Sequence, residues 1–207
     1  LTIILGGAKI DTKLELINQF LEKADNIIIG GGMAFTFLRA KGKNIGGSLL
    51  DKSMINIAKS IMNNAISKGT KLILPIDAVC ASSLEDRSDK KTYPIDKIPS
   101  KMMGLDIGPD SVTRFNKFLG NSETILWNGP MGVFESKAYE NGTREIAIHL
   151  VSCVTSGAKV IVGGGDTAAA LEKFGLMKDM THVSTGGGAS LELLSGNALP
   201  ALNALEK

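Results

Sequence analysis

Residues 159–174 read KVIVGGGDTAAALEKF, and this stretch decides the fold. Residues 159–162 form a short apolar run typical of a strand buried on both faces. Residues 168–174 follow a helical pattern opened by Asp166 and Thr167, and the glycine triplet at 163–165 joins the two segments. A strand followed by a glycine-rich turn and a helix is typical of a parallel sheet covered by helices.

The same alternation recurs along the chain. Further apolar runs of strand length occupy residues 2–5, 26–29, 71–74 and 124–127, and each lies upstream of a helical pattern. The helical segments show apolar stripes: Leu14, Ile17, Phe20 and Leu21 in one, and residues 54–66 in another. We therefore predict an α/β fold, a doubly wound, Rossmann-like domain of three αβα layers with a mainly parallel sheet. We expect one domain over residues 1–207, since domains usually span about 100–200 residues.

The pattern breaks between residues 81 and 101. A polar, charged run at 82–91 is followed by Pro94 and Pro99. Segments of this composition are common surface connectors, so we expect a solvated loop or an edge hairpin here in preference to a binding site.

Composition and charge exclude several classes of protein. Hydrophobic residues make up 43% and charged residues 21% of the chain, which is ordinary for a packed, soluble domain. The 23 basic and 21 acidic residues leave a net charge of only +2, so we expect no nucleic-acid partner. No apolar stretch approaches the roughly 20 residues that cross a bilayer, so we expect no membrane association.

Cysteine usage favours a cytoplasmic protein. Cys80 and Cys153 lie far apart, and neither has a second Cys or a His at ligand spacing. We expect two buried thiols, and neither a zinc site nor a disulfide. The chain begins with Leu1 and an apolar run that does not resemble a signal peptide, so we expect it to be part of a longer protein.

The placement of the 24 glycines carries the functional signal. Glycine clusters follow predicted strands at residues 6–7, 30–32, 163–165 and 186–188. In an open parallel sheet, ligands bind beyond the carboxyl ends of the strands, where unpaired N–H groups face outward. Glycine lets such a backbone approach an anion because it has no Cβ. A single cluster is more simply a tight turn, whereas four clusters predict a phosphate-binding edge.

Two kinds of phosphate ligand remain open. The chain contains neither a Walker A loop nor the protein-kinase signatures. Gly163-x-Gly165-x-x-Ala168 matches a dinucleotide fingerprint, but the strand at 182–185 lacks the acidic residue that would hold the ribose. Asp166 within the turn would repel a bare pyrophosphate and suits Mg²⁺. A metal-bound nucleotide is therefore preferred to the alternative, an NAD(P)-binding Rossmann domain.

Charged side chains near these turns extend the candidate site. Lys9 follows the first glycine pair, and Lys13 lies four residues later, on the same face if a helix has begun, so both ammonium groups could reach one polyphosphate. A sharp turn at Asn128 follows the only Trp, and Glu135 lies just beyond it. Glu135 could accept both ribose hydroxyls or simply begin a helix, and its position in the sequence favours neither.

Six motifs in order resemble the C-terminal, nucleotide-binding domain of phosphoglycerate kinase, over nearly the whole chain. They are LGGAK at 5–9, IGGGMA at 29–34, GLDIGP at 104–109, WNGPMGVFE at 127–135, GGDT at 164–167 and STGGGAS at 184–190.

The resemblance implies a role for each site residue. Adenine would lie near Gly30, Gly31 and the loop containing Gly104, and Glu135 would hold the ribose. The phosphates of ATP or ADP would be contacted by Lys13, Asn128, Gly164, Gly165, Asp166 and Thr167, with Asp166 holding Mg²⁺. The transferred phosphoryl group would be stabilised by Lys9, Gly186, Gly187 and Gly188.

The reaction implied by the resemblance is reversible phosphoryl transfer between 1,3-bisphosphoglycerate and ADP, giving ATP and 3-phosphoglycerate in glycolysis. A carboxylate acceptor is already ionised at neutral pH, so no general base is required and we expect His149 and His182 to be structural. Members of the family are usually monomeric.

Two departures from the family pattern stand out. The family's N-terminal domain, which binds phosphoglycerate and supplies an essential arginine, has no counterpart in these residues, so we expect nucleotide binding without turnover. The second departure is at 199–201, where Leu-Pro-Ala replaces the usual Leu-Pro-Gly. Because the tail of the family packs on the N-terminal domain, residues 198–207 are predicted to be loose.

Overall fold

A six-stranded parallel sheet forms the centre of the molecule. The computed structural model describes residues 1–85 and 88–184. Its large sheet has the order β3-β2-β1-β7-β8-β9, with every neighbouring pair parallel. These strands are β1 (Thr2–Leu5), β2 (Asn26–Ile29), β3 (Lys71–Ile73), β7 (Thr124–Asn128), β8 (Lys159–Gly163) and β9 (His182–Ser184). The five main predicted strands are confirmed to within one residue at each end.

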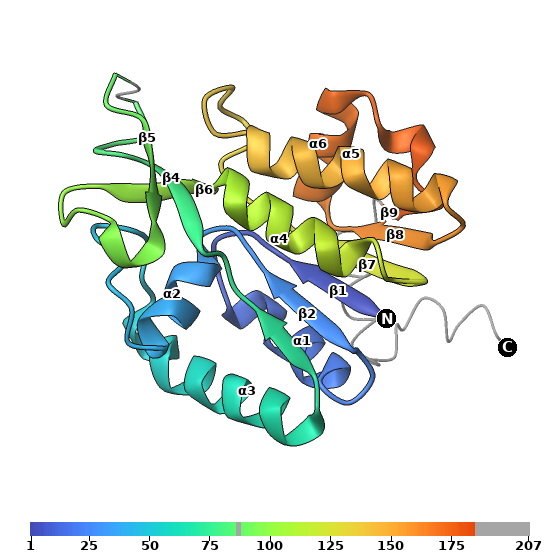
Figure 1. Ribbon diagram of the computed structural model, residues 1–207, viewed down its shortest axis with the longest axis horizontal. Helices are drawn as coiled ribbons and strands as arrows, with labels where there is room; N and C mark the ends of the chain where they lie inside the picture. The colour runs from blue at the N-terminus through green and yellow to red at the C-terminus, as the bar shows by residue number, and fades with distance from the viewer. Residues whose placement is uncertain (86–87, 185–207) are drawn as a thin grey trace, which may run out of the picture.

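Helices cover both faces of this sheet, which confirms the predicted three-layer, doubly wound fold (Figure 1). One face carries α1 (Leu14–Phe20), α2 (Met33–Ala40) and α3 (Ile55–Lys68), and the other carries α4 (Pro109–Leu119), α5 (Asn141–Thr155) and α6 (Gly165–Phe174). In β1, Ile3 and Leu5 pack into the first layer, whereas Ile4 packs into the second. The strands are apolar throughout because both of their faces are buried.

A second, three-stranded antiparallel sheet was not predicted. It has the order β5-β4-β6 and is formed by β4 (Asp77–Ala81), β5 (Lys91–Pro94) and β6 (Met103–Ile107). The expectation that each strand of the large sheet precedes a helix is wrong at β3, because β4 follows it. The described residues of the polar segment after residue 81 lie between or within the paired strands β4 and β5 at the edge of this sheet, which matches the edge hairpin, one of the two forms expected. Gly104, expected in a loop, lies within β6.

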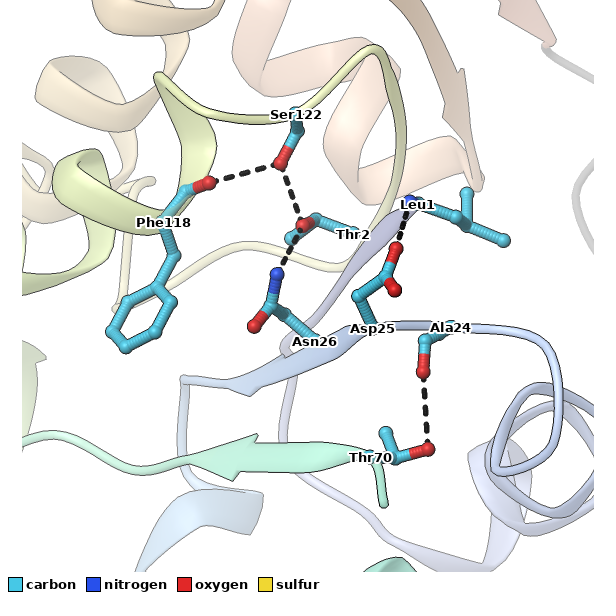
Figure 2. A network of polar contacts seen from close by, with 8 residues as sticks. All are labelled: Leu1, Thr2, Ala24, Asp25, Asn26, Thr70, Phe118 and Ser122. Atoms are coloured by element: carbon cyan, nitrogen blue, oxygen red, sulfur yellow. Dashed lines mark hydrogen bonds and ion pairs between the residues drawn. The ribbon is translucent and has the colours of Figure 1, made fainter. Parts of the chain in front are cut away.

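A polar network fixes the amino-terminal edge of the large sheet (Figure 2). The Asn26 side chain donates to the hydroxyl of Thr2 at 3.0 Å, and the Ser122 hydroxyl donates to the Phe118 carbonyl at 2.9 Å. The Thr2 and Ser122 hydroxyls lie 2.6 Å apart. Since Ser122 has only one proton, Thr2 is the donor between them. This chain of bonds satisfies the buried Thr2 and joins β1, β2 and the end of α4.

The strand order reverses between β1 and β7: β2 and β3 are added on one side of β1, whereas β7, β8 and β9 are added on the other. Such a switch point opens a crevice outside the carboxyl ends of the strands. Within the described residues, no helix is both long enough and apolar enough to cross a membrane.

Candidate functional site

A cavity of about 550 Å³ lies where the carboxyl edge of the large sheet meets the small sheet. Its lining comes from the turns after β1, β2, β7 and β8, from the small sheet, and from α2. The residues are Gly7, Ala8, Gly31, Gly32, Phe35, Gly47, Leu49, Pro75, Asp77, Ala78, Leu84, Met103, Gly104, Leu105, Asp106, Ile107, Pro130, Met131, Gly132, Val133, Glu135 and Asp166. A mostly apolar cavity with a few polar groups is typical of a small-molecule site.

The first two glycine clusters allow three backbone turns to pack against one another. The Gly7 amide donates to the Pro130 carbonyl at 2.9 Å, and the Gly31 amide donates to the Met131 carbonyl at 3.0 Å. A Cβ on Gly6 would lie 2.1 Å from the Pro130 oxygen. These amides therefore bond to protein carbonyls, and the glycines bring the turns together. Gly31 lines the cavity, whereas Gly30 does not.

Gly104 permits close contact between the small sheet and α2. A Cβ at this position would lie 2.0 Å from the Phe35 Cζ atom. The Gly104 amide donates to the Ser48 hydroxyl at 2.9 Å, which fixes β6 beside the turn that precedes α3. Phe35, Leu84 and Gly104 line the same cavity. The structure thus places Gly31 and Gly104, two of the three predicted neighbours of adenine, in the lining of one mostly apolar cavity.

Lys13 and Asn128 are in direct contact beside the cavity. The Lys13 ammonium donates to the Asn128 side-chain oxygen, and the Asn128 amide donates to the Gly163 carbonyl at 2.9 Å. Burial lowers the pKa of Lys13 below its ordinary value, and the nearby negative charge of Asp166 opposes this shift. These contacts join the carboxyl ends of β7 and β8 to the segment that follows β1.

The turn that precedes α6 has a backbone conformation that requires glycine. Gly164 has φ +95°, and a Cβ there would lie 2.9 Å from the Asn128 side-chain nitrogen. Gly165 is open, with no other atom within 4 Å of the position a Cβ would take. The buried Thr167 hydroxyl accepts the Gly129 amide at 2.7 Å, so this side chain ties α6 to β7.

Asp166 is exposed in the first turn of α6 and lines the cavity. No cluster of three or more potential metal ligands occurs in the described part of the chain. The single carboxylate of Asp166 fits Mg²⁺, which in nucleotide sites needs only one or two carboxylates because phosphate oxygens and water complete its shell.

Lys9 is exposed and lies outside the cavity lining. Lys9 and Lys13 were expected to share a face only if a helix had begun, and this condition is not met, because Asp11–Lys13 form a 3₁₀ turn and α1 begins only at Leu14. Lys9 does lie near Asp51: the hydrogen bond from the Ser53 hydroxyl is the main cause that lowers the pKa of Asp51, and the charge of Lys9 adds to this shift. The other predicted contacts of the transferred phosphoryl group, Gly186–Gly188, lie outside the described residues.

Glu135 is exposed at the rim of the cavity. Its carboxylate makes no hydrogen bond or ion pair with any other described residue, so it is available to a ligand. The alternative that Glu135 begins a helix is wrong, because α5 begins at Asn141.

Two buried acids of the cavity lining were missed by the sequence analysis. The Asp106 carboxylate accepts the Gly142 amide at 2.7 Å and the Ile107 amide at 2.9 Å, and burial raises its pKa to about 8. The Asp77 carboxylate accepts the Ser111 amide at 2.7 Å at the start of α4. The motif GLDIGP contains Asp106 and could have drawn attention to it, but nothing in the local sequence indicates that its carboxyl is buried.

The remaining predicted structural residues lie away from this cavity. Cys80 and Cys153 are buried and unpaired, as expected, and burial raises the pKa of Cys80 to about 12. Neither His149 nor His182 lines the cavity.

The sequence model of one family, described as phosphoglycerate kinase, matches residues 1–197. The chain belongs to the phosphoglycerate kinase family. It is 49% identical over 201 residues to the phosphoglycerate kinase of Thermosipho africanus, a match that covers 97% of this chain and 50% of the relative. It is 47% identical over 206 residues to that of Synechococcus elongatus, covering 100% of this chain and 51% of the relative.

Solved structures of the family have the same fold. The phosphoglycerate kinase structure from Coxiella burnetii superposes with a TM-score of 0.93 at 41% identity, over 99% of this chain and 52% of the other. The one from Pyrococcus horikoshii gives 0.82 at 28% identity, over 99% and 51%. The chain therefore spans about half the length of the relatives it matches.

Proposed function

We propose that this chain binds MgADP and MgATP as the nucleotide-binding part of a phosphoglycerate kinase. The observation that carries the proposal is the single cavity lined by Gly31, Gly104, Glu135 and Asp166, which come from four separate parts of the chain. An apolar slot, a free carboxylate and a second carboxylate at a helix start match the three parts of a metal-bound nucleotide.

The nucleotide would lie across the carboxyl edge of the sheet. Adenine would occupy the slot beside Gly31 and Gly104, and the Glu135 carboxylate would accept the ribose hydroxyls. Lys13, Asn128 and the turn at 164–167 would hold the phosphates. Asp166 would hold Mg²⁺, which supplies positive charge to the phosphate oxygens when bound.

The proposed reaction is reversible phosphoryl transfer between 1,3-bisphosphoglycerate and ADP. The acceptor in the ATP-consuming direction is a carboxylate, so the protein need not remove a proton. Positioning and neutralisation of charge would suffice, and Lys13, which contacts Asn128, would supply both. Lys9 and Gly186–Gly188 remain proposed contacts of the transferred group.

The 207 residues are proposed to bind nucleotide without turnover. They span about half the length of the relatives. By the family resemblance, 3-phosphoglycerate or 1,3-bisphosphoglycerate would bind to the other half. A monomeric, cytoplasmic glycolytic enzyme is the proposed context.

Calorimetric titration of this chain with MgADP, with NADH as the control ligand, tests the proposal. Saturable binding of MgADP without binding of NADH is the expected result. Preference for NADH would establish the NAD(P)-binding alternative, which the comparisons do not favour. Absence of MgADP binding would overturn the site assignment.

A further inference from the structure

The segment that carries Glu135 has no regular secondary structure between β7 and α5, so tertiary contacts must hold it in place. On one side, the Val133 amide donates to the Leu105 carbonyl of β6 at 2.9 Å. Within the segment, the Ser136 amide donates to the Val133 carbonyl at 3.1 Å. These bonds anchor the start of the turn but leave the carbonyls of residues 134 and 135 to be satisfied from elsewhere.

Lys173 reaches these carbonyls from the last turn of α6. Its ammonium donates to the Phe134 carbonyl at 2.7 Å and to the Glu135 carbonyl at 3.4 Å. It also pairs with the Glu140 carboxylate at 2.6 Å. The Glu140 side chain is only 12% exposed, so this ion pair is partly shielded from solvent and holds the ammonium in one place.

The contacts of Lys173 connect two parts of the proposed nucleotide site. Helix α6 begins at the turn that carries Asp166 and ends beside Lys173, so one rigid element spans both. Movement of residues 134–135 relative to α6 would change the position of the Glu135 carboxylate at the cavity rim. Hydrogen bonds from a charged donor resist such movement more strongly than neutral bonds do.

We propose that Lys173 is a positioning residue for ribose recognition: by binding the backbone at 134–135, it holds the Glu135 carboxylate where it accepts the ribose hydroxyls. This inference rests on the proposed nucleotide-binding function and adds a residue that touches no ligand itself. Its effect should be confined to ligands that have ribose hydroxyls.

The test compares the affinities of the chain for MgADP and for Mg-2′,3′-dideoxyADP, which lacks both hydroxyls. Lys173→Met keeps most of the length of the side chain and removes its donors. We expect it to weaken MgADP binding by about tenfold and to leave the dideoxy ligand within about twofold. Glu135→Gln should show the same selectivity, and the double variant should lose no more than Glu135→Gln alone.

Two further variants make the result specific. Lys178→Met removes an exposed lysine four residues past α6 that has no hydrogen bond or ion pair within the described residues, and it should bind both ligands like the unmodified chain. Glu140→Gln removes the charge that holds Lys173, and it should give a smaller loss with the same selectivity.

Three outcomes would overturn the proposal. Equal weakening of both ligands by Lys173→Met would indicate a general structural role, and unchanged binding of both would show that the contact does not matter. If the unmodified chain binds MgADP and the dideoxy ligand equally, Glu135 does not recognise ribose and Lys173 has nothing to position. Failure of the unmodified chain to bind MgADP would overturn the proposed function itself.

Discussion

Asp106 is a carboxyl group whose surroundings favour its neutral form. Burial raises its pKa to about 8, even though the amides of Gly142 and Ile107 and the charge of Lys90 favour the ionised form. The residue is 4% exposed, so the cost of removing a charge from water exceeds these favourable contacts.

Protein stability should therefore depend on pH through Asp106. The folded state keeps this proton up to about pH 8, whereas the unfolded chain loses it near the ordinary value of 3.8. Because the folded state binds more protons in this interval, the free energy of unfolding should fall as the pH rises from about 4 to about 8. Urea denaturation across this range should show a shallower fall for Asp106→Asn than for the unmodified protein.

The test compares how steeply the free energy of unfolding changes with pH in the two proteins. A loss of stability that is the same at every pH does not affect this slope. Asp179→Asn, at an exposed position, should keep the slope of the unmodified protein. Parallel curves for Asp106→Asn and the unmodified protein would show that Asp106 is ionised in the folded state.

Asp166 should matter only in the presence of a metal. Asp166→Ala is expected to weaken MgADP binding by at least about tenfold while changing the affinity for metal-free ADP much less. Asp110→Ala is a matched control, because Asp110 is also an exposed acid in the first turn of a helix but does not line the cavity. Calorimetry with and without Mg²⁺ decides the matter, and equal losses in both conditions would exclude Asp166 as a metal ligand.

At the scale of elements, the shape of the proposed nucleotide slot depends on how closely β6 approaches α2. The Phe35 ring of α2 fills the space beside Gly104, so a side chain on β6 would push the two elements apart. The hydrogen bond from the Gly104 amide to the Ser48 hydroxyl holds β6 against the turn that precedes α3.

Gly104→Ala should disturb both stability and binding. Overpacking against Phe35 is expected to lower the free energy of unfolding by about 1–3 kcal/mol and to weaken MgADP binding, because the slot changes shape. Gly120→Ala is the control: it ends α4, has no positive φ, and its Cβ would meet nothing closer than 3.4 Å. Chemical denaturation and calorimetry of both variants measure the effects. A Gly104→Ala protein as stable as the control would mean that the ring moves aside freely.

At the scale of the whole molecule, the ligand contacts predicted here link both halves of the large sheet and the small sheet. The turns after β1 and β2 come from one half, those after β7 and β8 from the other, and Gly104 from the small sheet. A nucleotide in this cavity would bind only the assembled form, so it should stabilise the entire fold.

MgADP should therefore raise the melting temperature. At a concentration one hundred times the dissociation constant, binding contributes about 2.7 kcal/mol, which corresponds to an increase of roughly 5–10 °C for a chain of this size. Differential scanning calorimetry should show this shift for MgADP and none for NADH. Equal shifts with both ligands would point to a less specific site than the one proposed.

The sequence by itself determined the buried strands of the large sheet and the glycine turn before α6. Buried parallel strands require continuous apolar runs, and the runs at 2–5, 26–29, 124–127 and 159–162 therefore mark their own positions. The turn before α6 was also readable, because Gly164 needs a positive φ and Thr167 follows at a helix start. Both signals depend only on residues that are neighbours in the chain, so they can be recognised from a single sequence.

Tertiary structure alone decided the small sheet and the role of the other glycines. Strand β5 is short and largely exposed, and it exists because it pairs with β4, so no apolar run marks it. Gly6 and Gly104 are needed because distant atoms, the Pro130 carbonyl and the Phe35 ring, occupy the space of a side chain. Such requirements arise between segments far apart in the chain, and a local pattern therefore cannot express them.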